Sequence, residues 1–97
     1  MFLGGQFKIT FGGYKTIGAN SYATFDVCDY GLIFIFEDGT QGAFAIFGVV
    51  GDVLTLIATS HYAVGEGGLF PISKTSGVLK ITNTLDRFTK HGVLSFG

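Results

Sequence analysis

Residues 32–50 read LIFIFEDGTQGAFAIFGVV, and this stretch decides the fold that the sequence predicts. The unbroken apolar run at 32–36 is typical of a central strand covered on both faces, because a strand with one wet face alternates apolar and polar residues. The Asp38-Gly39 pair that follows is favoured in tight hairpins, where both central residues take positive φ. We therefore expect residues 41–50 to fold back and pair antiparallel with residues 32–36.

A turn signal at Gly51-Asp52 divides the next apolar stretch, GAFAIFGVVGDVLTLIAT at 42–59, into two strands. This stretch nearly reaches the roughly 18 apolar residues of a membrane-spanning helix. Asp52 at its centre would cost about 2.5–3.5 kcal/mol inside a membrane helix. We therefore expect no membrane insertion, and we predict that residues 53–59 extend the hairpin into a three-stranded meander.

Strand signals continue on both sides of this meander, and no window shows helical periodicity. Residues 6–11 alternate strictly, with Phe7, Ile9 and Phe11 on one face, which predicts a half-buried strand, and Gly12-Gly13 ends the run. Further strands are predicted at 14–17, 22–27, 78–82 and 93–96. Pro71 lacks an N–H, which restricts residues 69–72 to a sheet edge or an irregular connection.

Seven or eight short strands, separated by turns at intervals of roughly 8–12 residues, indicate an all-β fold. The expected architecture is an antiparallel β-sandwich with a jelly-roll-like arrangement. No linker, low-complexity segment or repeat divides the chain, so residues 1–97 are predicted to form one domain.

The composition predicts an assembled protein. The chain of 97 residues is 47% hydrophobic and 13% charged, with eleven Phe and four Tyr, and a domain of this size has only a thin core. Some aromatic surface should therefore lie at an interface. A net charge of −1 gives little electrostatic repulsion between copies of the chain, so we expect a homo-oligomer or an embedded subunit. Without a basic excess or a basic cluster, nucleic acid is not an expected partner.

Catalytic and metal-binding signals are weak. Cys28, Asp29 and His61 are residue types of a nucleophilic triad, but no elbow or oxyanion turn accompanies them, so no enzyme is predicted. His61 and His91 have no local ligand spacing, and one thiol cannot form a Cys-based zinc site. We predict no cofactor and no metal site within one chain; histidines on a symmetry axis are an open alternative.

A glycine-rich stretch at 60–68 is the longest predicted loop. It contains His61, Tyr62 and Glu66, which together offer an aromatic face and hydrogen-bonding groups, so these three residues are the candidate ligand-contact site. Core packing of Tyr62 is the alternative. The N-terminal residues lack the basic and apolar regions of a secretory signal.

The order of turns and strands resembles a known group of proteins. The turn Gly18-Ala19-Asn20-Ser21, the alternating strand at 22–27, the LIFIF run, and the closing segments Ile81-Thr82-Asn83 and Val93-Leu94 carry the resemblance. They are similar to the β-sandwich head domains that end bacteriophage tail fibres and to related receptor-binding or virion-surface proteins.

This resemblance, which covers residues 16–96, implies a non-enzymatic virion module that forms a trimer and contacts other virion proteins or a host receptor or glycan. These 97 residues contain no pattern of a fibre shaft or coiled coil, so we expect a small capsid-decorating or tail-associated protein to be equally compatible. A free-standing carbohydrate-binding sandwich is the alternative from another class. It would be a stable monomer with an aromatic platform, and the absence of Trp counts against it.

Overall fold

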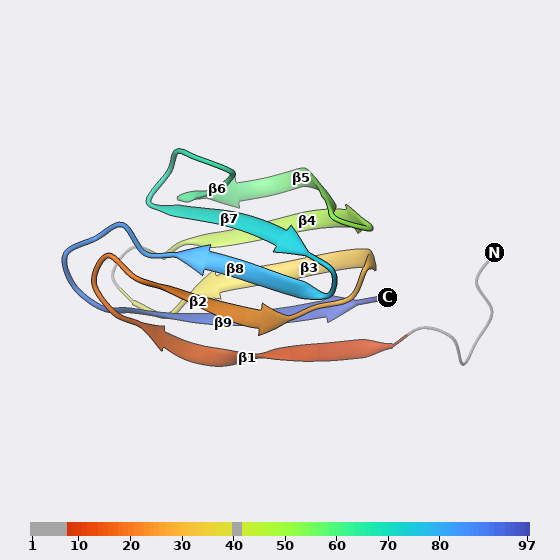
Figure 1. The fold of residues 1–97 in the computed structure, drawn as a ribbon, viewed down its shortest axis with the longest axis horizontal. Coiled ribbons are helices and arrows are strands. Elements are labelled where there is room, and N and C mark those ends of the chain that lie inside the picture. Colours follow the sequence, from red (N-terminus) through yellow and green to blue (C-terminus); the bar gives the residue numbers. More distant parts are fainter. Residues whose placement is uncertain (1–7, 40–41) are drawn as a thin grey trace.

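The computed structural model describes residues 8–39 and 42–97, which form nine strands in two packed sheets and no helix (Figure 1). Sheet A has the order β1-β9-β3-β4-β5, and sheet B has the order β2-β8-β7-β6. The strands are β1 (Ile9–Ile17), β2 (Tyr22–Asp26), β3 (Tyr30–Glu37), β4 (Phe44–Val50), β5 (Val53–Ser60), β6 (Tyr62–Val64), β7 (Phe70–Thr75), β8 (Val78–Thr82) and β9 (Thr89–Phe96). Figure 1 shows sheet B lying over sheet A with the strands roughly aligned, which confirms the predicted β-sandwich.

The predicted meander is confirmed. β3 pairs antiparallel with β4, and β4 pairs antiparallel with β5. The connection between β3 and β4 differs from the expected tight turn, because the Glu37 amide donates to the carbonyl of Ala43 (2.8 Å) and Gly42 takes the positive φ of 63°. Part of the predicted turn and strand, residues 40 and 41, lies outside the described residues. The connection is thus longer than the two-residue hairpin that Asp38-Gly39 predicted.

The LIFIF run lies at the centre of sheet A, but residues 8–39 and 42–97 cover only one of its faces. Ile33 and Ile35 point toward sheet B and are buried, whereas Leu32 and Phe36 are 39% and 48% exposed on the opposite face. The prediction of a strand covered on both faces is therefore wrong for the single chain, because sheet B supplies a second layer on one side only.

β1 corrects the predicted N-terminal strands in two respects. It runs unbroken through Gly12-Gly13, with a bulge between Phe11 and Gly13 in its pairing with β9. A side chain at Gly12 would meet the Asp26 carbonyl at 2.6 Å, so glycine permits this close approach to β2. A half-buried strand would bury the face of Ile9 and Phe11, but these side chains are 61% and 67% exposed, so this expectation is wrong. Phe7 lies outside the described residues.

The predicted loop at 60–68 contains a short strand, β6, which pairs parallel with β7. This strand brings the number of strands above the expected seven or eight. It also places β7 inside sheet B, so the expectation that Pro71 marks an edge is wrong. Pro71 is in register with Ala63 of β6, and the pairing with β8 begins only at Ile72, so the missing N–H of Pro71 removes no hydrogen bond from the β8 ladder.

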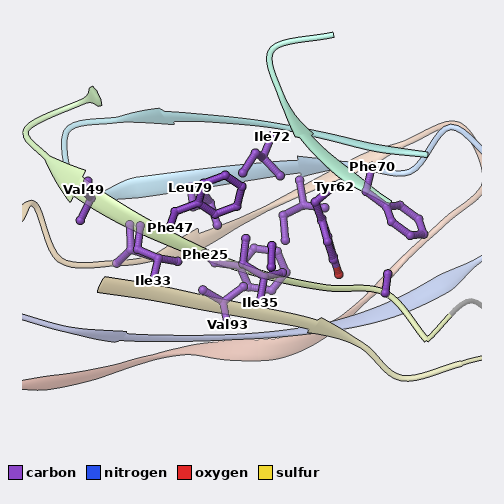
Figure 2. Close-up of a cluster of buried hydrophobic side chains, with 14 of the residues drawn as sticks. Phe25, Ile33, Ile35, Phe47, Val49, Tyr62, Phe70, Ile72, Leu79 and Val93 are labelled. Carbon is purple, nitrogen blue, oxygen red and sulfur yellow. The ribbon is translucent and has the colours of Figure 1, made fainter. Parts of the chain in front are cut away.

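The core lies between the two sheets (Figure 2). Sheet A contributes Ile33, Phe47 and Val93, and sheet B contributes Phe25 and Leu79, all nearly inaccessible to solvent. Full burial of such side chains stabilises the fold by about 1.5–3 kcal/mol each.

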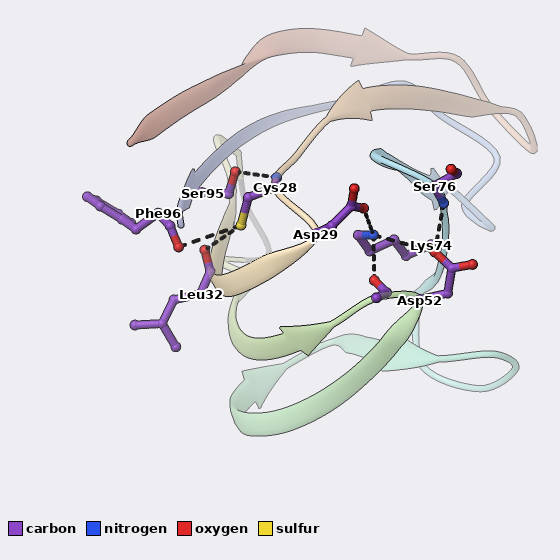
Figure 3. Close-up of polar contacts among 9 residues, drawn as sticks. Cys28, Asp29, Leu32, Asp52, Lys74, Ser76, Ser95 and Phe96 are labelled. Atoms are coloured by element: carbon purple, nitrogen blue, oxygen red, sulfur yellow. Dashed lines mark hydrogen bonds and ion pairs between the residues drawn. The ribbon is translucent and has the colours of Figure 1, made fainter. Parts of the chain in front are cut away.

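A buried polar group fixes each end of the sandwich. The Lys74 ammonium lies 2.6 Å from the Asp29 carboxylate and donates to the Gly51 carbonyl (2.6 Å), while Asp52 accepts from the Ser76 amide (2.7 Å) (Figure 3). The hydrogen bond from Lys74 lowers the pKa of Asp29. These contacts tie β7 and the β7–β8 turn in sheet B to the loop before β3 and the β4–β5 turn.

Asn83 anchors the chain where it leaves β8. Its buried amide donates to the carbonyls of Ile17, Gly18 and Arg87 at 2.7–3.2 Å and accepts from the Leu85 amide at 3.0 Å. The end of β1 and the 83–88 connection are thus held together by one side chain whose hydrogen-bonding groups are satisfied.

Candidate functional site

The candidate ligand-contact residues on the predicted loop do not form a common surface. His61 has a φ of 73°, is exposed, and turns the chain from β5 in sheet A to β6 in sheet B. Its Nδ1 lies 2.6 Å from the Ser60 hydroxyl. Tyr62, the next residue, points into the core and is 2% exposed, so the core-packing alternative holds for it. Glu66 is exposed beside the glycines.

Tyr62 belongs to a buried polar cluster that links the two sheets. Its hydroxyl lies 2.7 Å from Nδ1 of His91 on β9, and the Thr89 hydroxyl lies 2.7 Å from Nε2 of the same ring. Burial lowers the pKa of His91 to about 4, so the imidazole is neutral at pH 7. Burial, aided by the nearby charge of Glu37, raises the pKa of Tyr62. Both ring nitrogens of His91 are engaged, which makes the cluster a fixed connection between the layers.

The residue types considered for a nucleophilic triad are directed elsewhere. Asp29 binds Lys74, and His61 contacts Ser60. The Cys28 thiol lies 3.5 Å from the carbonyl oxygen of Phe96 (Figure 3). Within residues 8–39 and 42–97, no three or more His, Cys, Asp or Glu side chains are grouped so as to hold a metal ion.

A pocket of about 300 Å³ opens at the end of the sandwich where the β3–β4 and β8–β9 connections meet. It is lined by Glu37, Asp38, Gly39, Arg87, Phe88, Thr89 and Lys90. Phe88 is 61% exposed, and the Asp38 carboxylate accepts a hydrogen bond from Tyr14, which raises the pKa of that tyrosine. The pocket thus combines an aromatic ring with carboxylates and cations.

The most extensive candidate surface is the outer face of sheet A, which we define as the side chains that point away from sheet B in three cross-strand rows. In strand order from β1 to β5, the first row is Ile9, Phe96, Leu32, Gly48 and Thr55. The second row is Phe11, Leu94, Phe34, Ile46 and Ala58, and the third is Tyr14, Gly92, Phe36, Phe44 and Ser60. None of these positions carries a charged side chain.

Aromatic rings on this outer face contact one another. Phe36 stacks on Tyr14, with ring centroids 6.3 Å apart, and its ring covers Gly92, where an added Cβ would lie 2.3 Å from the ring. Phe34 and Phe96 meet edge to face at 5.4 Å. These contacts order the side chains but leave the face in solvent, since Phe11 and Phe44 are still 67% and 45% exposed.

The outer face of sheet B has the opposite character. One cross-strand row consists of Thr24, Lys80 and Ser73, and its neighbour contains Asp26 and Thr75. The Lys80 ammonium covers the Tyr22 ring at 4.4 Å. Sheet B therefore presents a mainly polar surface to solvent, and the apolar outer face belongs to sheet A.

Sequence reasoning predicted an aromatic interface but not its position. The signal was present in LIFIF, whose alternate residues are apolar on both faces of β3, and in the alternation of Ile9 and Phe11. Both were interpreted as signs of burial within the chain. The side chains of Leu94 and Phe96 join this face because β9 pairs with both β1 and β3, and that long-range pairing leaves no local sequence signal.

No known protein family, curated protein or solved structure matches this chain. None of the described residues belongs to a helix that is long and apolar enough to cross a membrane.

Proposed function

We propose that this chain is a non-enzymatic structural subunit of a protein assembly, held in that assembly through the outer face of sheet A. The observation that carries the proposal is the set of three uncharged, aromatic-rich rows across all five strands. Soluble monomers rarely expose a continuous apolar patch of more than a few hundred Å², and larger patches mark interaction surfaces. The low charge of the whole chain also favours association.

The setting that we propose is a virion, in which the chain is a homo-oligomeric surface module or a small capsid-decorating or tail-associated protein. The turn and strand pattern that resembles phage fibre heads supports this setting. In such an assembly sheet A is covered, whereas sheet B, the loop at 61–68 and the pocket at Phe88 remain available to other virion proteins, a host receptor or a glycan.

Light scattering on the purified protein in detergent-free buffer tests the proposal. We expect a mass at least twice that of the 10.3 kDa chain. Phe34→Lys places a charge at the centre of the outer face and should give a monomer, because a buried unpaired charge is costly. Thr24→Lys makes a similar change on the outer face of sheet B and should leave the mass unchanged. A wild-type monomer, or equal effects of the two variants, would contradict the proposal.

A carbohydrate-binding function is the second candidate, and the pocket beside Phe88 is the observation that favours it. An exposed ring beside carboxylates and cations provides the stacking and hydrogen bonds that sugar recognition needs. In a glycan-array experiment, this function predicts binding that Phe88→Ala abolishes and Phe34→Lys retains. Absence of binding to any glycan, or binding that Phe88→Ala leaves intact, would reject it.

A further inference from the structure

We propose that two copies of this chain pack sheet A against sheet A about a two-fold axis that runs along β3. The inference rests on the proposed function and specifies both the partner, a second copy, and its orientation. β3 is the middle strand of the five, so this axis places β9 of one copy over β4 of the other, and β1 over β5. Each cross-strand row then lies over the same row of the second copy.

Side-chain size favours this axis because the two halves of the outer face differ. The half formed by β1 and β9 presents large residues such as Phe11, Tyr14 and Phe96. β5 presents only small side chains in the three rows, namely Thr55, Ala58 and Ser60, and β4 presents Gly48 beside the larger Ile46 and Phe44. A two-fold interface brings the same patch of both copies together, so it must be self-complementary.

Each row contains at least one pair that matches a large residue with a small one, whereas Leu94 lies over Ile46 and the β3 side chains lie over their own copies. Phe96 lies over Gly48 of the second copy in the first row. In the second row Phe11 lies over Ala58, and in the third Tyr14 lies over Ser60. These pairs follow from the strand order and the registers.

Gly48 leaves an unfilled space in this face, which we call the Gly48 notch. An added Cβ would meet only the Thr55 carbonyl oxygen, at 4.0 Å, so the chain itself does not require a glycine there. Gly inside a strand is destabilising and often marks a close approach of another group. Phe96 of a second copy supplies such a group.

The alternative two-fold axis, perpendicular to the strands, would place β1 over β1 and β5 over β5. Phe11 would then face Phe11, while Ala58 would face Ala58. Large residues would meet at one edge of the interface, and a void would remain at the other. Close packing at interfaces matches that of protein interiors, so this arrangement is disfavoured.

The size and charge of the outer face suit a stable dimer. Five strands spaced about 4.8 Å apart, and three rows about 7 Å apart along the strands, give a flat projection of roughly 500 Å². The protruding rings raise the accessible area toward the roughly 800 Å² that each partner contributes to a standard interface. No titratable group other than Tyr14 lies in the three rows, so two copies do not repel each other there.

Gly48→Val tests the packing directly. In the single chain this change adds a β-branched residue to a strand interior where space is open, so the monomer should be as stable as the wild type or more stable. In the dimer the valine fills the notch that Phe96 occupies, and we expect the dimer dissociation constant to rise roughly tenfold or more. Ser73→Val adds a similar apolar group to the outer face of sheet B and should leave dimerisation unchanged.

The direction in which Gly48→Val changes the dimer dissociation constant distinguishes specific packing from non-specific association of apolar surfaces. A merely adhesive apolar face would associate as well or better after a valine is added. Unchanged or tighter dimerisation of Gly48→Val would therefore overturn the proposed packing.

Isotope-filtered NOE spectra of an equal mixture of ¹³C-labelled and unlabelled protein test the orientation. We expect a contact between the Ala58 methyl group and the Phe11 ring of the second copy. These residues lie on the first and last strands of sheet A, roughly 19 Å apart within one chain at about 4.8 Å per strand. Contacts of Phe11 with Phe11 and of Ala58 with Ala58 would establish the perpendicular axis and overturn the proposal.

The outcomes distinguish this inference from the proposed function. A trimer that Phe34→Lys dissociates would overturn the two-fold arrangement and leave the assembly function standing. A detergent-free monomer would overturn both. A monomer that co-sediments with phosphatidylcholine vesicles would assign the outer face to lipid and would likewise overturn both.

Discussion

The two faces of sheet A are built from the same strands and from similar residue types, yet the part of the chain that the structure describes covers only one of them. On the covered face, Ile33 and Phe47 are buried against sheet B, whereas Leu32 and Phe36 on the open face remain in solvent. Two layers can hide only one side of each sheet. The apolar residues of the open face are therefore the basis of the proposed assembly.

Comparison with sheet B shows that the exposed apolar face is particular to sheet A. Its strands alternate in the usual way, with Phe25 and Leu79 inside and Thr24 and Lys80 outside. A chain with a generally apolar composition would show rows of apolar side chains on both outer faces, whereas the described outer face of sheet B sets the exposed ring of Tyr22 among polar and charged side chains. The difference between the outer faces of the two sheets is the reason to assign assembly to sheet A.

Two adjacent residues on β4 give the largest expected contrast between the covered and the open face. Phe47→Ala removes a ring from the core and should reduce the free energy of unfolding by about 3–5 kcal/mol. Ile46→Ala removes a side chain from the open face and should cost less than about 1 kcal/mol in the monomer while weakening association. Urea denaturation in a Phe34→Lys background, which holds the protein monomeric, measures the two costs. Equal costs would mean that the open face contributes to folding as much as the core does.

The strands were more predictable than the faces they present. The hairpin of β3 and β4 and the meander into β5 followed from local signals in 32–59. The burial of Ile9, Phe11 and LIFIF did not, because alternation identifies a strand but not which layer covers it. The position of Pro71 was misjudged because the parallel strand β6 is only three residues long, and its pairing depends on the long-range placement of β7.

The candidate site shows the same limit. Tyr62 and His61 are neighbours in sequence, but the left-handed conformation at His61 sends Tyr62 into the core, where it meets His91. That contact links residues far apart in the chain and leaves no local pattern. The outer face of sheet A likewise depends on β9 lying between β1 and β3.

Acid should lower the stability of the packing between the two sheets, where His91 is buried. The three rows of the outer face of sheet A contain no side chain that takes up a proton in acid. His91 has its pKa lowered by burial from 6.5 to about 4, so between these values the unfolded chain binds a proton that the folded chain does not. The free energy of unfolding is then unaffected by this group above about pH 6.5 and falls as the pH drops toward 4, by an amount on the order of 1–3 kcal/mol.

His91→Gln tests the origin of this pH dependence. The glutamine amide can still hydrogen-bond with the hydroxyls of Tyr62 and Thr89, but it does not titrate. Its stability should therefore be flatter than that of the wild type between pH 4 and 6.5 in urea titrations. A slope equal to the wild-type slope would assign the effect to other groups.

The smallest contrast comes from neighbouring residues on β7, where Lys74 points inward and Ser73 outward. Lys74→Met keeps the aliphatic chain but removes the hydrogen bonds to Asp29 and Gly51, so it should destabilise the monomer less than Phe47→Ala does. Ser73→Val should change the free energy of unfolding by no more than about 0.5 kcal/mol. Thermal denaturation at pH 7 compares the two.

Thermal denaturation repeated from pH 7 down to below the pKa of Asp29 identifies the partner of Lys74. The ammonium lowers the pKa of Asp29 below its usual 3.8, so the stabilisation by this pair is present above about pH 4 and is lost as the pH falls below that value. Lys74→Met should lose this part of the acid dependence, and Ser73→Val should retain it. If both variants kept the wild-type acid limb, the Lys74–Asp29 contact would not be what holds sheet B over sheet A at this end of the sandwich, and the covered face would depend on its apolar core alone.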